Sequence, residues 1–438
     1  MQKLWYVMAR FWVRLAVKLF YRRIEIHGRE TYPADGPVLL APNHQNAFMD
    51  ALIPAVFAPR PIHYLVRADV FKSKFARSLF RSFNMMPVYR QRDGLANLSK
   101  NDEVFAECFR ILRNDGTLLI FPEASHLGER RLRPLSKGFA RILFGALEDH
   151  DHLHIQVVPM GLNYSNYQDS QSRLLVNLGK PIAVSDYYET FKENPAKAMS
   201  NLRDDLQVLL ADQIVNIETP HGLRAVDIEL ERILPYYLHR TGGYAQPRGE
   251  MEFYKMREKA IANLPADHPF FRRIEIYNSE MEKRRLQAPF FFIAQKDGGH
   301  WVIQTLLLLL LLPVFFLSWV LHAPSYFIIK TLLKRFVSDK QFYSSIKLVG
   351  TIILFPIFGI IFAGLAAALS DRPLFAALVM LAFYPTSVFV IRELRLPYRY
   401  LLTKFRMLWL CWRKMDLCKY LMQIEEDLLR DYKRHPRV

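Results

Sequence analysis

The distribution of apolar residues along this chain changes near residue 300. Before that point, runs of four to seven mostly apolar residues alternate with longer segments in which apolar residues recur at helical spacing. After it, long uncharged stretches follow one another with few residues between them. The pattern predicts an α/β region followed by apolar helices long enough for a membrane.

Six short apolar runs in the first part predict β-strands. They are Val38–Ala41, His63–Val66, Met85–Tyr89, Thr117–Phe121, Gln156–Leu162 and Leu174–Leu178. Helical periodicity fills several of the gaps, notably Leu98–Arg113 and Lys137–Glu148. Strands that alternate with helices favour an α/β fold with a mixed central sheet flanked by helices, and we expect it to occupy residues 24–218. Residues 219–299 are polar, charged and helical in period, which predicts a linker or accessory region.

Three uncharged segments predict membrane helices within residues 300–391. They cover about 302–329, 348–370 and 373–391, and the first contains seven consecutive leucines. Spanning a bilayer takes roughly 20 apolar residues, so all three qualify. Only Asp371 and Arg372 separate the last two, which predicts a tight hairpin.

The orientation of these segments is a separate question. The stretch 330–347 is rich in lysine and arginine, and the basic tail 392–438 holds twelve such residues against six acids. The positive-inside rule places both on the cytoplasmic side, with the α/β domain. Three full spans would instead put them opposite that domain. We therefore favour a first segment that is kinked at Pro313 and enters and leaves on the same side.

The first 23 residues predict an amphipathic helix at a membrane interface. Basic residues interrupt the apolar pattern every four positions, at Arg10, Arg14 and Lys18, so no cleavable signal sequence is indicated. Trp5 and Trp12 lie beside this cationic stripe, which is typical of a helix in the headgroup layer. The alternative is an amphipathic helix that packs on its own domain.

Charge and composition narrow the class of partner. The net charge is +17 and 51% of the residues are hydrophobic. Nucleic acid, an anionic membrane surface or phosphorylated substrates would each suit such a charge, but basic residues beside apolar spans favour membrane lipids and phosphorylated substrates over nucleic acid. The cysteines are three, Cys108, Cys411 and Cys418, and predict neither a disulfide framework nor a zinc site. A reducing compartment is the simplest interpretation.

The candidate chemistry begins where the first predicted strand ends. His44 follows that strand, and Asp50 comes six positions later. On one continuous helix the two side chains would point apart, so contact requires a helix that begins after His44, with Asn46 as its N-cap. Asp50 would then fix the imidazole tautomer and leave the other nitrogen as a base. A structural histidine–aspartate pair is the alternative. Because no protein nucleophile accompanies the pair, direct transfer to a substrate hydroxyl is indicated.

Further polar residues follow other predicted strands. They are Arg90 and Arg92 after the third strand, Glu123, Ser125 and His126 after the fourth, and Lys137 at the start of a helix. The ends of neighbouring strands in an open α/β sheet usually meet at a ligand site. Guanidinium groups there suit an anion, although Lys137 is equally well interpreted as a surface or capping residue, and His126 as a loop residue.

These residues form four short blocks that resemble the membrane-associated glycerolipid acyltransferase family. The blocks are Asn43, His44 and Asp50; Pro87-Val88-Tyr89-Arg90; Phe121-Pro122-Glu123; and Val157-Val158-Pro159. Two departures from the family's pattern are a His-x5-Asp spacing, one residue longer than the commonest form, and Ala124 where glycine is usual. The longer spacing and the surrounding sequence are most similar to the fungal-type glycerol-3-phosphate/dihydroxyacetone-phosphate acyltransferase branch.

The resemblance implies a role for each matching residue. His44 would remove the proton of an acceptor hydroxyl as it attacks an acyl thioester, and Asp50 would hold His44. Arg90, aided by Arg92, would bind the acceptor phosphate, and Glu123 would contact an acceptor hydroxyl or position the arginine. Ser125 and Lys137 are further candidate substrate contacts. No cofactor is implied; acyl-CoA or acyl-carrier protein would be a co-substrate.

Three alternatives stay open on the sequence alone. The acceptor could be 1-acylglycerol 3-phosphate, since it also presents a phosphate and a free hydroxyl. A hydrolase of acyl lipids would use the same base on water, although the chain lacks the Gly-x-Ser-x-Gly motif of the usual lipases. A non-catalytic membrane tether would explain the spans and the charge but leave the four blocks unexplained.

Overall fold

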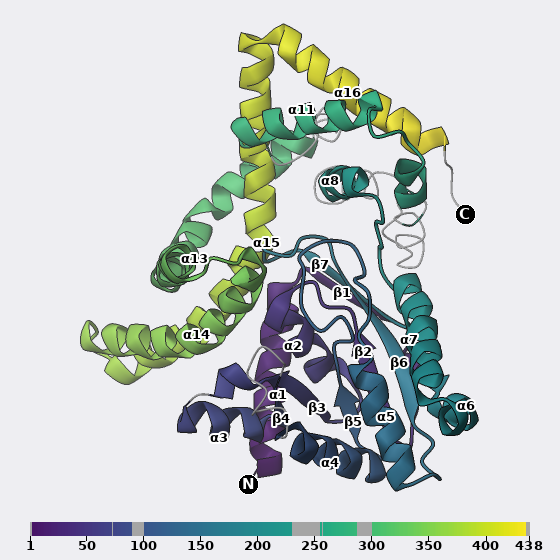
Figure 1. Ribbon diagram of the computed structural model, residues 1–438. Helices are drawn as coiled ribbons and strands as arrows, with labels where there is room; N and C mark the ends of the chain where they lie inside the picture. Colours follow the sequence, from purple (N-terminus) through teal and green to yellow (C-terminus); the bar gives the residue numbers. More distant parts are fainter. Residues whose placement is uncertain are drawn as a thin grey trace. The chain divides into compact units, whose positions relative to one another are not determined.

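The computed structural model describes residues 2–71, 73–89, 100–229, 255, 257–286 and 300–434. They fall into two compact units (Figure 1). The first comprises Met1–Asn216 together with Asp339–Ser345, and the second comprises Ile217–Ser338 and Ile346–Val438. A short segment late in the sequence therefore belongs to the N-terminal unit.

An eight-stranded mixed sheet forms the centre of the first unit. Its strands are β1 (Arg23–His27), β2 (Val38–Pro42), β3 (Ile62–Arg67), β4 (Met85–Val88), β5 (Thr117–Leu119), β6 (Gln156–Tyr164), β7 (Arg173–Leu178) and β8 (Ile182–Ala183). They run in the order β1-β7-β6-β2-β5-β3-β4, with β8 beside β6. Among the described strands, two pairs are antiparallel, β6 with β7 and β6 with β8, and the other pairs are parallel. The predicted fold class is confirmed, and so are all six predicted strands; β1 and β8 were not predicted.

Helices cover both faces of the sheet (Figure 1). In the first unit these are α1 (Gln2–Phe20), α2 (Ala47–Phe57), α3 (Lys74–Ser82), α4 (Lys100–Arg113), α5 (Gly138–Asp149), α6 (Tyr188–Glu193) and α7 (Pro195–Asp212). Because side chains alternate along a strand, Leu39 of β2 packs in the core that α4, α5 and α7 share. The next residue, Leu40, packs in the opposite core beside α2. The completely buried β2 is thus sandwiched, and its end is held rigidly.

Helix α1 turns its apolar side outward. Leu4, Met8 and Phe11 are exposed, whereas Arg10 donates a hydrogen bond to the carbonyl of Ala58 at the end of α2. A cation there also suits the negative end of the helix dipole. Arg10 was predicted to face lipid headgroups, but it binds the domain. The apolar face of α1 is left uncovered within this unit.

The second unit is helical. It contains α8 (Pro220–Ile228), α11 (Pro269–Lys283), α13 (His300–Phe336), most of α14 (Tyr343–Ala368), α15 (Pro373–Arg413) and α16 (Met415–Arg434). Three of them, α13, α14 and α15, are long and apolar enough to cross a membrane, and each contains one of the predicted segments. His322 of α13 lies 2.8 Å from the hydroxyl of Ser387 on α15, so a polar contact joins two otherwise apolar helices.

Within the second unit, one buried polar contact lies inside the described part of residues 219–299, and another joins this part to α16. Arg257 forms an ion pair with Glu229 at 2.7 Å, and both side chains are buried. Tyr277 of α11 donates to Glu425 of α16 at 2.5 Å. A buried charge without its partner is costly, so Glu425 favours the packing of α11 against α16 that brings Tyr277 to it.

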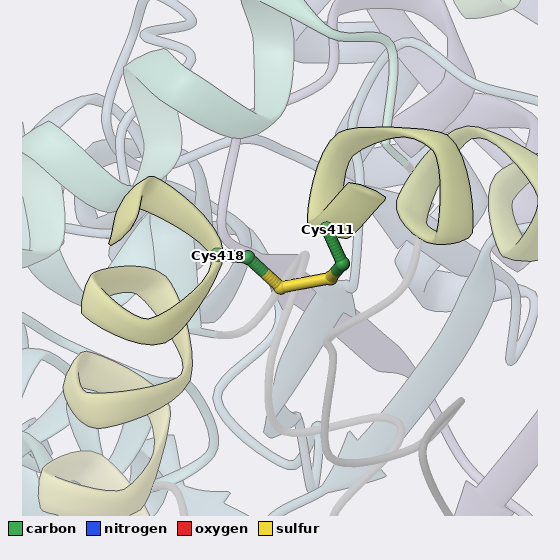
Figure 2. Close-up of a disulfide and its surroundings, with 2 residues drawn as sticks. All are labelled: Cys411 and Cys418. Atoms are coloured by element: carbon green, nitrogen blue, oxygen red, sulfur yellow. A yellow bond between two sulfur atoms is a disulfide. The ribbon is translucent and has the colours of Figure 1, made fainter. Parts of the chain in front are cut away.

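Cys411 and Cys418 form a disulfide, which corrects the expectation that no cysteines pair (Figure 2). Helix α15 ends at Arg413 and α16 begins at Met415, so the chain turns sharply between them. The turn brings the two Cα atoms to 5.2 Å, within the range that a disulfide needs. Spacing along the sequence could not show this, because the break in the helix decides it. Cys108 is free and buried.

Candidate active site

The turn between β2 and α2 brings His44 and Asp50 together. Strand β2 ends at Pro42 and α2 begins at Ala47, so the helix starts after His44, as contact required. The imidazole Nδ1 donates to Oδ2 of Asp50 at 3.0 Å. Asn46 occupies the N-cap position, but its side chain caps no amide of α2. The expected contact between His44 and Asp50 is present, but the Asn46 side chain does not cap the helix.

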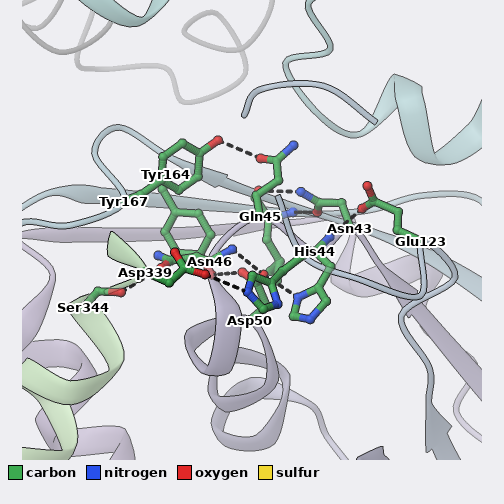
Figure 3. Close-up of polar contacts among 12 residues, drawn as sticks. Asn43, His44, Gln45, Asn46, Asp50, Glu123, Tyr164, Tyr167, Asp339 and Ser344 are labelled. Atoms are coloured by element: carbon green, nitrogen blue, oxygen red, sulfur yellow. Dashed lines mark hydrogen bonds and ion pairs between the residues drawn. The ribbon is translucent and has the colours of Figure 1, made fainter. Parts of the chain in front are cut away.

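Asp50 is completely buried and accepts three hydrogen bonds (Figure 3). Besides His44, the backbone N–H of Asn46 donates to Oδ2 at 2.7 Å. The hydroxyl of Tyr164, at the end of β6, donates to Oδ1 at 2.7 Å. A carboxylate held by three donors cannot rotate freely. It fixes the tautomer of His44 with the proton on Nδ1 and leaves Nε2 as the basic nitrogen.

Two aromatic rings enclose the His44 imidazole. Phe121 stacks on it with ring centroids 3.9 Å apart, and His126 approaches edge-on with centroids 5.3 Å apart. The His44 side chain is 16% exposed. Burial and the neighbouring His44 lower the pKa of His126 below its ordinary value, and its bond to Asp339 opposes them. His126 is therefore mainly neutral at neutral pH.

Glu123 holds the backbone on both sides of this site. One carboxylate oxygen accepts from the backbone N–H of His44 at 2.6 Å, and the other accepts from that of Arg133 at 3.0 Å. Burial raises the pKa of Glu123 to about 7, although the two amide hydrogen bonds work in the opposite direction. The resemblance implies that Glu123 contacts an acceptor hydroxyl or positions the arginine, and this stays a prediction. In the structure, each of its oxygens accepts from a backbone amide.

Ala124, the residue in the usual glycine position, has a left-handed backbone with φ of 60°. Glycine adopts this conformation without cost, whereas a side chain clashes with the following carbonyl. Ala124 therefore adopts a conformation that glycine favours, although it carries a side chain.

The remaining predicted substrate contacts do not all lie beside His44. Ser125 accepts a hydrogen bond from the guanidinium of Arg133, which adds a cation that the sequence analysis did not single out. The ammonium of Lys137 donates to Ser200 on α7 at 2.7 Å and is not brought among the partners of His44. Arg90 and Arg92 lie outside the described residues.

Asn43 and Tyr164 also shape the site. The sequence assigned no role to either residue, because their contacts depend on neighbouring strands. Asn43 uses its side-chain amide to bridge to β6, accepting from the N–H of Leu162 at 2.6 Å and donating to its carbonyl at 3.1 Å. Tyr164 lies at the end of the same strand. The Val-Pro block in β6 was the available signal. Within the described residues, no group of three or more histidine, cysteine or acidic side chains is arranged to hold a metal ion.

Comparison with known proteins adds several similarities. The crystal structure of the 1-acyl-sn-glycerophosphate acyltransferase of Thermotoga maritima superposes with a TM-score of 0.36 at 16% identity, covering 48% of this chain and 79% of that one. Glycerol-3-phosphate O-acyltransferases 2 and 1 of Saccharomyces cerevisiae are 33% and 29% identical over 23% and 21% of this chain. An uncharacterized acyltransferase of Schizosaccharomyces pombe is 20% identical over 41% of this chain.

These relatives are matched over only part of their length. The chain spans 14%, 12% and 39% of the three yeast proteins, respectively. Residues 23–163 match the family described as Acyltransferase, a range that includes β1 to β5, most of β6 and the whole His44–Asp50 turn. This part of the chain is therefore an acyltransferase domain.

Proposed function

We propose that this protein transfers a fatty acyl group from acyl-CoA or acyl-carrier protein to a hydroxyl of glycerol 3-phosphate or dihydroxyacetone phosphate. The observation that carries the proposal is the imidazole of His44, whose Nδ1 is bound to the buried carboxylate of Asp50. A histidine held in this way presents Nε2 as a general base. The partial similarity to two yeast glycerol-3-phosphate acyltransferases supports the choice of acceptor.

The reaction needs no protein nucleophile. Nε2 of His44 takes the proton from the acceptor hydroxyl as its oxygen forms a bond to the thioester carbonyl carbon. The carbon–sulfur bond then breaks, and the imidazolium returns the proton to the leaving thiolate. Asp50 stabilises the imidazolium between these two steps, and its bond to Tyr164 keeps the carboxylate oriented.

Cations beside the site would bind the acceptor's phosphate. Arg133 is partly exposed and reaches Ser125, two residues beyond the glutamate that holds His44. The family resemblance adds Arg90 and Arg92 to this role. A guanidinium matches two phosphate oxygens in one plane, so one arginine can fix both the position and the orientation of the acceptor.

An acceptor assay tests this function. The purified full chain in detergent receives acyl-CoA with radiolabelled glycerol 3-phosphate or, separately, its 1-acyl form. We expect label in a lipid product with glycerol 3-phosphate and much less with the 1-acyl form. Labelling of only the 1-acyl acceptor would contradict the proposal and indicate a 1-acylglycerol-3-phosphate acyltransferase. Release of free fatty acid would contradict it and indicate a hydrolase.

We also propose that the protein is an integral membrane protein whose catalytic domain and accessory region share the cytoplasmic face. Residues 339–345 belong to the catalytic unit, so the connection between α13 and α14 stays on the side of that unit. The sequence between 217 and 299 offers no uncharged stretch long enough to span a bilayer. Helix α13 is continuous and contains Pro313 and Pro324; on this proposal both of its ends lie on one side of the membrane, while α14 and α15 cross.

The basic residues favour the cytoplasmic side for this connection. Maleimide labelling of single cysteines in sealed membrane vesicles tests the topology. We expect Ser338→Cys to label together with a cysteine in the catalytic domain, and Asp371→Cys to label only from the opposite side. Labelling of both positions from one side would contradict the arrangement.

A further inference from the structure

The segment that joins α13 to α14 contacts the site from outside the acyltransferase domain's own sequence. We call Asp339–Ser345 the 339–345 connection; it belongs to the first unit, although the residues on either side of it belong to the second. It contains a short 3-10 helix, η8 (Lys340–Phe342), and the first residues of α14. Ser344 meets Asn46 at the start of α2 (Figure 3), and Asp339 meets His126 in the loop after β5.

The first contact reaches the donors of the Asp50 carboxylate. Ser344 donates to Oδ1 of Asn46 at 2.7 Å, across 298 residues of sequence. Both side chains are buried. The backbone N–H of the same Asn46 donates to Asp50. Because the following residue, Ala47, has a left-handed backbone with φ of 42°, this turn needs support, and Ser344 supplies it from outside.

The second contact holds the ring beside His44. Nε2 of His126 and Oδ2 of Asp339 lie 3.3 Å apart, which gives a second histidine–aspartate pair. The other Asp339 oxygen accepts from the backbone N–H of Gln341 at 2.9 Å and so caps η8. Phe342 meets the edge of the His126 ring with centroids 5.2 Å apart. His126 is therefore enclosed between Phe342 and His44.

We propose that three residues of the 339–345 connection, Ser344, Asp339 and Phe342, are positioning residues for His44 and Asp50. Ser344 fixes the turn that presents the Asp50 carboxylate, while Asp339 and Phe342 fix the His126 ring against which His44 rests. The catalytic geometry then depends on a segment anchored by two apolar helices, so correct seating of the membrane part is a condition for acyl transfer. This inference rests on the proposed function.

Neighbouring serines provide a matched test of the first contact. Ser344 and Ser345 are 1% and 3% exposed, but the hydroxyl of Ser345 has no hydrogen-bond partner among the described residues. We expect Ser344→Ala to lower kcat about 5- to 10-fold, the usual effect of one buried hydrogen bond, with KM for both substrates within about twofold. Ser345→Ala should leave both constants within about twofold. Equal losses in the two variants, or no loss in Ser344→Ala, would overturn the inference.

Asp339→Asn tests the second contact and covers the case in which Ser344→Ala does not fold. Asparagine keeps an oxygen for the Gln341 amide but loses the charge that faces His126. We expect a several-fold fall in kcat, an unchanged thermal midpoint and recovery in Asp339→Glu. A fall in the thermal midpoint that matches the fall in kcat and is not recovered by glutamate would indicate a merely structural role.

A cross-link gives a readout that needs no activity. A Cβ added to Gly128 would lie 3.0 Å from Cγ of Gln341, so cysteines at these two positions should pair. In a full chain whose Cys411 and Cys418 are replaced by serine, we expect oxidation to join Gly128→Cys to Gln341→Cys and to preserve the acyl-transfer rate. Failure to cross-link, or cross-linking that abolishes transfer, would overturn the inference. An inactive parent chain that still cross-links would refute the proposed function and leave the seating itself established.

Discussion

Two histidine–aspartate pairs lie side by side at the candidate site, and they differ in how they are built. His44 and Asp50 are six residues apart, and their aspartate is completely buried with three donors. His126 and Asp339 are 213 residues apart, and the side chain of their aspartate is 43% exposed. The first pair is formed by one turn of chain, while the second depends on the fold of the whole catalytic unit.

The difference in burial separates their roles. A charge pair near solvent contributes at most about 1 kcal/mol, because water screens it and because ordering two side chains costs entropy. A buried aspartate that accepts hydrogen bonds at both oxygens holds its histidine much more firmly. The first pair therefore suits the proton transfer, and the second suits the positioning of a neighbouring ring.

The largest effect should come from the base itself. We expect His44→Ala to lower kcat by about 10²- to 10⁴-fold, because general base catalysis typically contributes that much. The measurement is the steady-state rate with acyl-CoA and glycerol 3-phosphate. His152→Ala is the control, since that side chain is 76% exposed. Full activity in a folded His44→Ala protein would end this mechanism.

The second prediction ranks the two pairs directly. Asp50→Asn should lower kcat by roughly 10²-fold or more, since the amide group cannot stabilise an imidazolium as a carboxylate does. His126→Ala should lower kcat by only about 10-fold, because it removes a wall of the site and leaves the base intact. Equal losses would show that His126 and Asp339 take part in the proton transfer and do not only position a neighbouring ring.

The third prediction concerns Glu123. It lies between Phe121 and His126, the two rings that contact His44. Its pKa is about 7 in the folded protein and ordinarily 4.5, so the folded state holds this proton more tightly than the unfolded state does. Its contribution to stability is fully present below pH ~4.5 and is lost as the pH rises through about 7. The loss amounts to about 3 kcal/mol.

Glutamine at position 123 cannot titrate, so it removes this dependence. We expect the difference in unfolding free energy between the parent and Glu123→Gln, measured by denaturant titration at pH 5 and pH 8, to shrink at the higher pH. Glu129→Gln is a control on the same loop, with a side chain that is 41% exposed. A difference that stays constant between the two pH values would contradict the raised pKa.

The smallest effect should follow from Ala124→Gly. Glycine relieves the left-handed strain at φ of 60° but gains freedom in the unfolded chain, so the net stabilisation should be about 0.5–1 kcal/mol. Thermal unfolding measures it. Ala140→Gly, in the interior of α5, should be destabilising instead. A loss of stability in Ala124→Gly would mean that the backbone at this position is not left-handed.

The sequence predicted what depends on neighbouring residues. The six apolar runs became strands, and His44 met Asp50 because one short turn joins them. Strand β1 was missed because Arg23, Glu25 and His27 interrupt its apolar residues, as an edge strand tolerates.

Other features depend on tertiary structure, and no local pattern indicates them. Which backbone amides fill the oxygens of Glu123 is decided by the packing of the loop after β5. The contacts of Asp339 and Ser344 join positions more than two hundred residues apart. The pairing of Cys411 with Cys418 required the exact place where a long helix breaks, and helix boundaries are the least certain part of a sequence-based prediction.

The bond between Cys411 and Cys418 has a practical consequence for anyone who handles this protein. On the proposed topology this elbow faces the cytoplasm, where glutathione and thioredoxin keep most thiols reduced. Protein exposed to air during extraction would then contain the disulfide, and the turn between α15 and α16 would be more rigid than it is inside the cell. Preparing one batch with a reductant and one without, and comparing their rates, would show whether the angle between α15 and α16 influences turnover.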